Sequence, residues 1–147
     1  MKYIIYFLFF AFLGVAHEVF WRSILDYKKK KNKRMLGDSS LWMFPIYGTL
    51  TFIILFVQTY FGDFPWYLRG LLYTLLIFTW EYISGYIIKK ISGISPWDYS
   101  KETTDGVGSP KKYHLHGLIC LQYAPIWYLE GLLAEWIYLW MESNVNL

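Results

Sequence analysis

The fold is decided by residues 3–25, YIIYFLFFAFLGVAHEVFWRSIL, whose apolar run is unbroken as far as Ala16. A helix needs roughly 20 residues, each rising about 1.5 Å, to cross the hydrocarbon core of a bilayer. This stretch is long enough, so we expect a transmembrane helix. Residues 1–16 alone resemble a signal peptide. Apolar residues resume after Glu18 and a dense basic segment follows, so we expect no cleavage.

The composition of the whole chain agrees with a membrane protein. Of its 147 residues, 56% are apolar and 17% are charged, whereas about 25% of the residues in soluble domains are charged. Aromatic residues reach 22%, and Trp and Tyr favour the lipid–water interface. The single cysteine, Cys120, excludes an internal disulfide framework.

Three further stretches are long and apolar enough to span a membrane, at about 41–61, 66–88 and 114–141. With residues 3–25 they predict an all-α integral membrane protein with four transmembrane helices, which form a single domain over residues 1–147. Asp63 is placed to cap the third helix, and residues 38–40 offer caps for the second. Gly93 marks the end of the third helix, whereas Pro125 lies inside the fourth and should kink it.

Basic residues set the expected orientation. Segment 22–37 holds seven of the 14 Lys and Arg residues, and segment 89–113 holds five. A four-pass chain places both segments on one side of the membrane, and the positive-inside rule makes that side the cytoplasm. The N- and C-termini then lie outside. We expect segment 98–113 to be a mobile cytoplasmic loop of a multi-pass protein in the cell membrane.

Two carboxylates, Glu18 and Glu81, fall inside predicted helices, each roughly 10 Å from the cytoplasmic end. A charge in hydrocarbon costs roughly 2.5–3.5 kcal/mol on insertion scales, so such groups survive when they face the bundle, pair or line a wet cavity. Small and polar residues share a helix face with each of them. We therefore expect a polar pocket open toward the cytoplasm. Its candidate ligand-binding residues are Glu18, Tyr47, Glu81, Trp97, Asp98 and Tyr99.

The same carboxylates have an alternative, purely structural interpretation. Glu18 and Arg22 stand at i and i+4, in the favourable order for an ion pair within a helix. Glu81 would then be neutral and hydrogen-bonded to Tyr47 or Thr51. The sequence leaves both interpretations open.

Other polar residues carry weaker signals. Glu130 and Glu135 lie toward the outer side, where they would snorkel to the interface. His114 and His116 are two apart and point to different faces of a helix, so we expect no metal site, and no cofactor. The chain has no G-x-x-x-x-G-K-[ST] motif, which excludes an ATP-hydrolysing subunit of the usual kind. The basic run 28–31 is expected to set topology and touch anionic lipid, not nucleic acid.

Five local strings occur in a recognisable order and spacing: GVAHEVFWR (14–22), SSLWMFPIYG (39–48), WEY (80–82), PWDYS (96–100) and GLICLQYAPIW (117–127). Over about residues 10–130 they resemble the vertebrate transmembrane protein 229 family. They also resemble the bacterial family named Putative ABC-transporter type IV, the CmpB-like permeases. PWDYS is the most specific of the strings.

The resemblance implies a small multi-pass membrane protein, whose transporter label comes from family naming. The positions that match the family include every predicted pocket residue. They are Glu18, Pro45, Tyr47, Gly48, Glu81, Trp97, Asp98, Tyr99, Ser100, Gly117 and Trp127. The chain departs from the family in His114 and His116, and in a longer polar insert after Ser100.

Three functions remain open. The first, which we rank highest, is the binding or transport of a small or amphipathic molecule. Glu18 and Glu81 would bind a cation or exchange protons, and Trp97 and Tyr47 would stack on the ligand. Four helices make a thin bundle, so a pathway would require a homodimer.

The other two functions differ in chemistry. A membrane enzyme acting on a lipid or isoprenoid would use Glu81 and Asp98 as its catalytic acid and base. A non-catalytic assembly subunit would use the carboxylates to hold the helices together. The expected partners are membrane lipid, a small-molecule or lipid ligand and a second copy of the chain.

Overall fold

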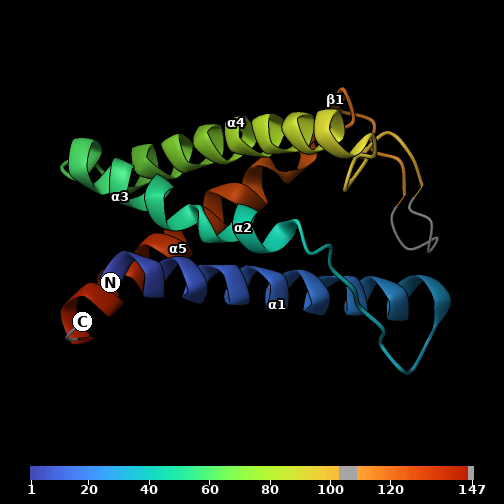
Figure 1. The fold of residues 1–147 in the computed structure, drawn as a ribbon, viewed down its shortest axis with the longest axis horizontal. Helices are drawn as coiled ribbons and strands as arrows, with labels where there is room; N and C mark the ends of the chain where they lie inside the picture. Colours follow the sequence, from blue (N-terminus) through green and yellow to red (C-terminus); the bar gives the residue numbers. More distant parts are fainter. Residues whose placement is uncertain (103–108, 146–147) are drawn as a thin grey trace.

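The computed structural model describes residues 1–102 and 109–145, so part of the predicted mobile loop 98–113 lies outside the described residues. The described chain is mainly helical (Figure 1). In chain order its elements are α1 (Lys2–Lys30), α2 (Met43–Gly48), α3 (Leu50–Phe61), α4 (Trp66–Ser92), β1 (His114–Leu115), β2 (Ile119–Cys120), a 3-10 turn η1 (Leu121–Tyr123) and α5 (Ala124–Asn144).

Three segments of the described chain are long and apolar enough to cross a membrane: Lys2–Lys30, Met43–Phe61 and Trp66–Ser92. They correspond to the first three predicted helices. Helix α1 continues beyond the predicted end at residue 25 because its last turn carries Lys28, Lys29 and Lys30. Cations are favourable at a helix C-terminus. Helix α5 is less apolar and is not among the three candidate spans.

The second span is interrupted at Thr49, where α2 ends and α3 begins. Pro45 has no N–H to donate within α2. The Thr49 hydroxyl donates to the carbonyl of Ile46 at 2.6 Å, a local bond that competes with regular helix geometry. The sequence predicts one continuous helix here because its apolar pattern is continuous.

The predicted helix caps are partly wrong. Helix α4 begins after Pro65 without a side-chain cap, so Asp63 does not cap it. Near α2, the Ser40 hydroxyl accepts a bond from the Trp42 N–H at 3.3 Å. The end of α4 is as predicted, since Gly93 adopts a φ of +74° and its N–H bonds the Lys89 carbonyl.

The fourth helix begins at Ala124, not at residue 114 as predicted. Strands β1 and β2 pair antiparallel there, with His114 opposite Cys120 and Leu115 opposite Ile119. The turn between them has positive φ values at His116 and Gly117, which a helix does not permit. Pro125 therefore lies in the first turn of α5, where its missing N–H costs no helical bond, and does not kink the helix.

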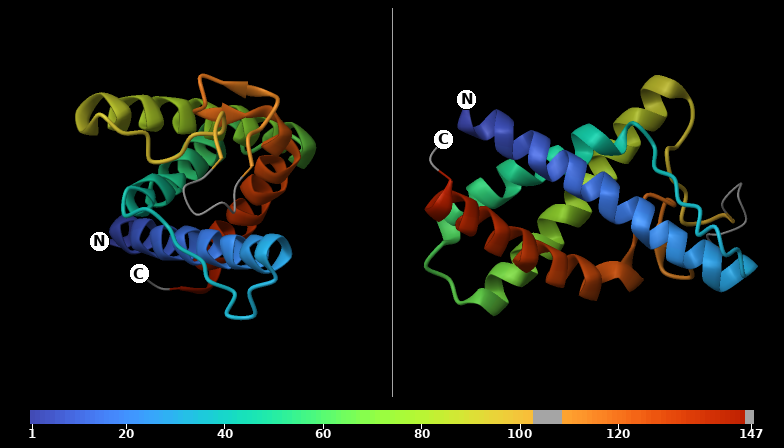
Figure 2. Two further views of the ribbon diagram at one scale, coloured as in Figure 1. Left: turned by 90° about the vertical axis from the view of Figure 1, so that its right-hand side faces the viewer. Right: turned by 90° about the horizontal axis from the view of Figure 1, so that it is seen from below.

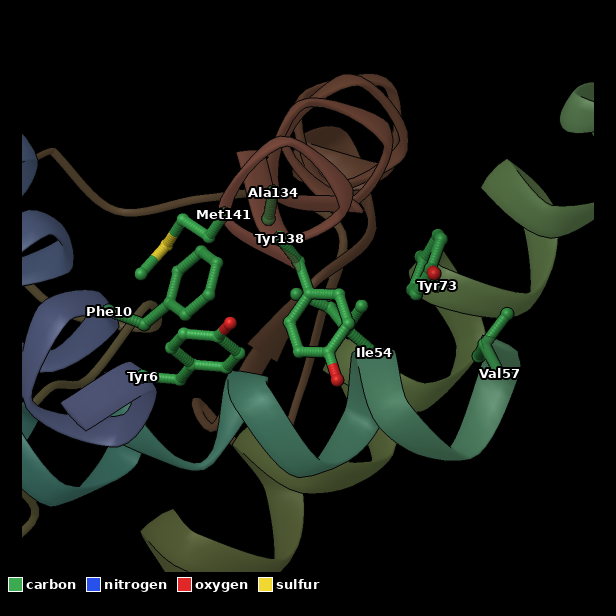
Figure 3. Close-up of a cluster of buried hydrophobic side chains, with 8 residues drawn as sticks. All are labelled: Tyr6, Phe10, Ile54, Val57, Tyr73, Ala134, Tyr138 and Met141. Carbon is green, nitrogen blue, oxygen red and sulfur yellow. The ribbon is translucent and has the colours of Figure 1, made fainter. Parts of the chain in front are cut away.

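A hydrophobic core joins α1, α3, α4 and α5 in the half of the molecule that holds the chain termini (Figures 1 and 3). Its buried members are Tyr6, Phe10, Ile54, Val57, Tyr73, Ala134, Tyr138 and Met141. The rings of Tyr6 and Tyr138 meet edge to face at 5.4 Å between centroids. At this terminal end Lys2 pairs with Glu142 at 2.6 Å.

The connector between α1 and α2 and the described parts of the connector between α4 and β1 lie at the opposite end, which we call the connector end (Figures 1 and 2). Lys29 on α1 donates to Glu102 and to Ser109, both at 3.1 Å. Residues of the two basic segments of the sequence are therefore neighbours at this end.

Candidate functional site

The first half of the candidate site lies where α2 packs closely on α1. A Cβ atom on Gly14 would collide with the ring of Tyr47, so the glycine allows this ring to lie against the α1 backbone. The Tyr47 hydroxyl donates to Glu18 Oε2 at 3.4 Å, and the Ser39 hydroxyl donates to the same oxygen at 2.7 Å. Glu18 thus faces α2 and the connector.

The second half surrounds Glu81 on α4. The Tyr99 hydroxyl donates to Glu81 Oε1 at 2.6 Å. Glu81 Oε2 is buried and has no hydrogen-bond partner in the described chain. The indole of Trp127, on α5, lies beside the same carboxyl group, and its buried N–H also has no partner among the described residues.

The two halves lie close enough to interact electrostatically. Burial raises the pKa of the Tyr99 phenol well above its usual range, and the nearby Glu81 carboxylate, Tyr123 and Tyr47 raise it further. Tyr99 therefore remains a hydrogen-bond donor at any physiological pH. Tyr47 also lies within electrostatic range of Glu18, Glu81 and Glu130. The structure brings Glu18, Tyr47, Glu81 and Tyr99 together, and ligand binding by them remains a prediction.

The PWDYS segment docks onto the β1–β2 hairpin, and this docking positions Tyr99. The Tyr99 N–H donates to the Gly117 carbonyl at 2.9 Å. The Trp97 indole N–H donates to the Leu118 carbonyl, also at 2.9 Å. The Trp97 ring packs on Gly85 of α4, where a Cβ atom would approach it within 2.8 Å. The segment thus clamps the hairpin to α4, and stacking of Trp97 on a ligand remains a prediction.

Asp98 lies at the edge of the same docked segment. Its Oδ1 accepts bonds from the Ser100 N–H at 2.9 Å and the Ser100 hydroxyl at 2.5 Å. Partial burial raises the pKa of Asp98, but the Ser100 bonds and the Lys101 ammonium outweigh it and hold this pKa below its ordinary value. Within the described chain no bond joins Asp98 to Glu81, so the geometry gives the proposed catalytic pair no direct contact.

Gly117 provides a test of the docked segment. It adopts a φ of +72°, and a Cβ atom there would collide with Asp98 Oδ1. Gly93 has a similar φ of +74° with nothing within 4 Å of the same position. Gly117→Ala should lower the free energy of unfolding by more than the roughly 1–2 kcal/mol of left-handed strain, whereas Gly93→Ala should cost only that strain.

Unfolding of the two variants in detergent measures this difference directly. An equal loss of stability in both variants would contradict the close packing of Asp98 on the hairpin. Hydrogen exchange at the Tyr99 amide gives a local control, because its bond to Gly117 should weaken only in Gly117→Ala.

Several polar contacts between helices were not predicted from the sequence. His17 Nδ1 lies 3.4 Å from Glu130 Oε1 and so links α1 to α5. Glu135 is 3% exposed, so the prediction that it snorkels is wrong. Its Oε1 accepts from Arg69 Nε at 2.7 Å and from Gln58 Nε2 at 2.6 Å. The sequence did indicate that Arg69 needs a partner, because it is the one basic residue inside the third predicted span.

The two histidines of the hairpin lie outside any helix, contrary to the prediction that they open the fourth one. The Tyr82 hydroxyl is 2.9 Å from His116 Nδ1, and the Gly117 N–H donates to His114 Nδ1 at 3.2 Å. Each ring thus has a local structural contact. Across residues 1–102 and 109–145, no three His, Cys, Asp or Glu side chains are arranged to hold a metal ion.

A family comparison places the chain among known sequences. The model of the family described as Putative ABC-transporter type IV matches residues 5–147. The chain belongs to this family. The match bears out one of the two resemblances seen in the sequence, and the likeness to the transmembrane protein 229 family remains a prediction. No solved structure matches the chain.

The described surface of this type IV family protein includes the following two apolar grooves. One, of about 440 Å³, is lined by Leu41, Trp42, Phe44 and Pro45. The other, of about 370 Å³, lies between α4 and the segment that contains Ile119 and Leu121. Neither includes a predicted site residue, so the polar pocket open to one side remains a prediction.

Proposed function

We propose that this protein binds and transports a small or amphipathic cation at the connector end of its helix bundle. The groups involved are Glu18 and Tyr47 on one side and Glu81, Tyr99 and Trp127 on the other; we call them the inner cluster. Membership of a family named for transporters supports transport. The sequence has no G-x-x-x-x-G-K-[ST] motif, so the proposal does not include ATP hydrolysis of the usual kind by this chain.

The observation that carries the proposal is the bonding of Glu81. One carboxylate oxygen is fixed by Tyr99 at 2.6 Å, and the other is buried beside the Trp127 indole N–H, with no hydrogen bond of regular length and angle in the described chain. A buried acceptor without a partner costs about 1–3 kcal/mol, and more if it is charged. A cation or a proton would offset this cost. Three aromatic rings lie in a row nearby, with centroids 5.5 Å apart for Tyr99 and Tyr123 and 6.1 Å apart for Tyr123 and Trp127. Such rings would favour an organic cation.

The proposal also includes a membrane arrangement with one more span than the three apolar segments show. We infer that α5 is a fourth span of a multi-pass protein in the cell membrane, because its 21 residues reach about 31 Å at 1.5 Å each. Two of its carboxylates have partners on other helices, since Glu130 lies 3.4 Å from His17 and Glu135 lies 2.7 Å from Arg69. The basic connector end then faces the cytoplasm by the positive-inside rule.

The alternatives have less support. An acid–base enzyme needs Glu81 and Asp98 at one substrate, but Asp98 bonds Ser100 at the surface. A purely structural subunit accounts for Glu18 and for the Arg69–Glu135 pair, but in the described chain Glu81 has no basic partner such as Arg69 gives Glu135. A homodimer remains part of the proposal if four helices cannot enclose a pathway.

Flux into liposomes tests the proposed function. Purified protein should accelerate the uptake of phenethylammonium, or the movement of protons followed with an internal pH dye, above the rate in empty liposomes. A heat-denatured sample reconstituted in the same way controls for leakage. If neither the ammonium ion nor protons move faster than in that control, transport is excluded.

A further inference from the structure

The chain carries a dense basic segment at the end of α1. Residues 28–36 read KKKKNKRML, and we call them the basic tip. All six basic side chains in it are exposed. Three of them form the last turn of α1, and Lys31 follows in a left-handed conformation that ends the helix. The chain then turns back along α1 toward α2 (Figure 1).

The basic tip has a defined structure. Asp26 is only 3% exposed; its Oδ2 accepts the Leu36 N–H at 3.2 Å and its Oδ1 lies 3.6 Å from Lys30 Nζ. The Met35 N–H bonds the Asn32 carbonyl at 3.0 Å. This turn leaves Met35 and Leu36 44% and 61% exposed beside the basic side chains.

Most of the positive charge of the tip is not neutralised within the described chain. Lys29 pairs with Glu102 and Lys30 with Asp26. For the other four basic side chains, no ion pair occurs among residues 1–102 and 109–145. These side chains are Lys28, Lys31, Lys33 and Arg34. The surface therefore suits a partner rich in negative charge.

We propose that the basic tip is a binding site for anionic phospholipid headgroups. The tip continues directly from a membrane-spanning helix, so headgroups lie within reach of its side chains. Basic residues at such a surface each strengthen the attraction about fivefold. The exposed pair Met35 and Leu36 adds apolar side chains that enter the interface beside the cations. A site for nucleic acid or free phosphate would gain nothing from that pair.

Native mass spectrometry of the full chain in detergent tests the proposal by counting bound phosphatidylglycerol against phosphatidylcholine. Lys33→Gln with Arg34→Gln should lower the affinity for phosphatidylglycerol roughly 25-fold, at about fivefold per charge. Lys89→Gln with Lys90→Gln is the matched control, because it removes two exposed charges from the last turn of α4 at the same end. Met35→Ser with Leu36→Ser should weaken lipid binding without a change of charge.

Each outcome decides the matter. Loss in the tip variant with retention in the α4 variant supports the site. Equal loss in both means general surface attraction and overturns it. The proposal is also overturned if inorganic phosphate or a short RNA, added at the same total negative charge, displaces phosphatidylglycerol. It is overturned as well if phosphatidylcholine binds as tightly as phosphatidylglycerol. Thermal unfolding of each variant separates lost binding from lost folding.

Discussion

Arg69→Ala is expected to lower the free energy of unfolding by about 3–5 kcal/mol, the cost of leaving one partner of a buried ion pair uncompensated. Arg69 Nε lies 2.7 Å from Glu135 Oε1, and the two side chains are 19% and 4% exposed. Arg69 also donates to the carbonyls of Gly62 and Phe64. Without Arg69, the turn between α3 and α4 loses these two hydrogen bonds, and Glu135 Oε1 keeps only its bond from the Gln58 amide.

The chain offers a matched control at the same end. Lys2 pairs with Glu142 at 2.6 Å, but these side chains are 35% and 29% exposed. Exposed pairs contribute about 1 kcal/mol or less, so Lys2→Ala should change stability little. Arg69→Met combined with Glu135→Leu should regain most of the stability, because replacing both partners by apolar residues leaves no buried charge. Equal losses in Arg69→Ala and Lys2→Ala, measured by unfolding in detergent, would refute the role given to the buried pair.

Glu81→Gln should weaken the binding of phenethylammonium about ten- to hundredfold. Hydrogen bonds to charged groups contribute about 1.5–3 kcal/mol, and each 1.4 kcal/mol is tenfold in affinity. Glutamine keeps the shape of the side chain and an oxygen that can accept from Tyr99, so the fold should persist. Isothermal titration of the purified protein in detergent measures the change.

Two further variants sharpen this result. Glu142→Gln removes a carboxylate at the terminal end and should leave affinity unchanged. Tyr99→Phe should reduce affinity less than Glu81→Gln, because the carboxylate remains and loses only the hydrogen bond that holds it in position. An ammonium ion that binds Glu81→Gln as tightly as the natural chain would rule out Glu81 as its ligand.

Hydropathy predicted the three apolar spans because membrane crossing depends on length and composition, which a sequence contains directly. It failed at residues 114–123, whose apolar side chains continue into α5 without a change of composition. The decisive signals there are conformational. Gly117 adopts a positive φ, and Pro125 occupies the first turn of α5, where it causes no kink.

The candidate site was predictable only in part. Helical spacing and depth brought Glu18, Tyr47 and Glu81 to one level, but spacing cannot assign partners between helices. The partner of Glu81 is Tyr99, not the predicted Tyr47 or Thr51, because the PWDYS segment folds back onto α4 through its bonds to the hairpin. Arg69 stands out as the one basic residue of its predicted span, but its partner Glu135 is 66 positions away and local spacing cannot identify it.

Solid-state NMR of the protein in lipid bilayers tests most directly whether two acidic side chains share the bundle interior. With labelled glutamate and tyrosine, the carboxyl carbon of Glu81 should correlate with the Tyr99 ring, and the carboxyl carbon of Glu18 with the Tyr47 ring. Each signal should disappear in the variant that replaces its glutamate with glutamine. Correlations of both carboxyl carbons with lipid acyl protons, and none with tyrosine, would contradict the account.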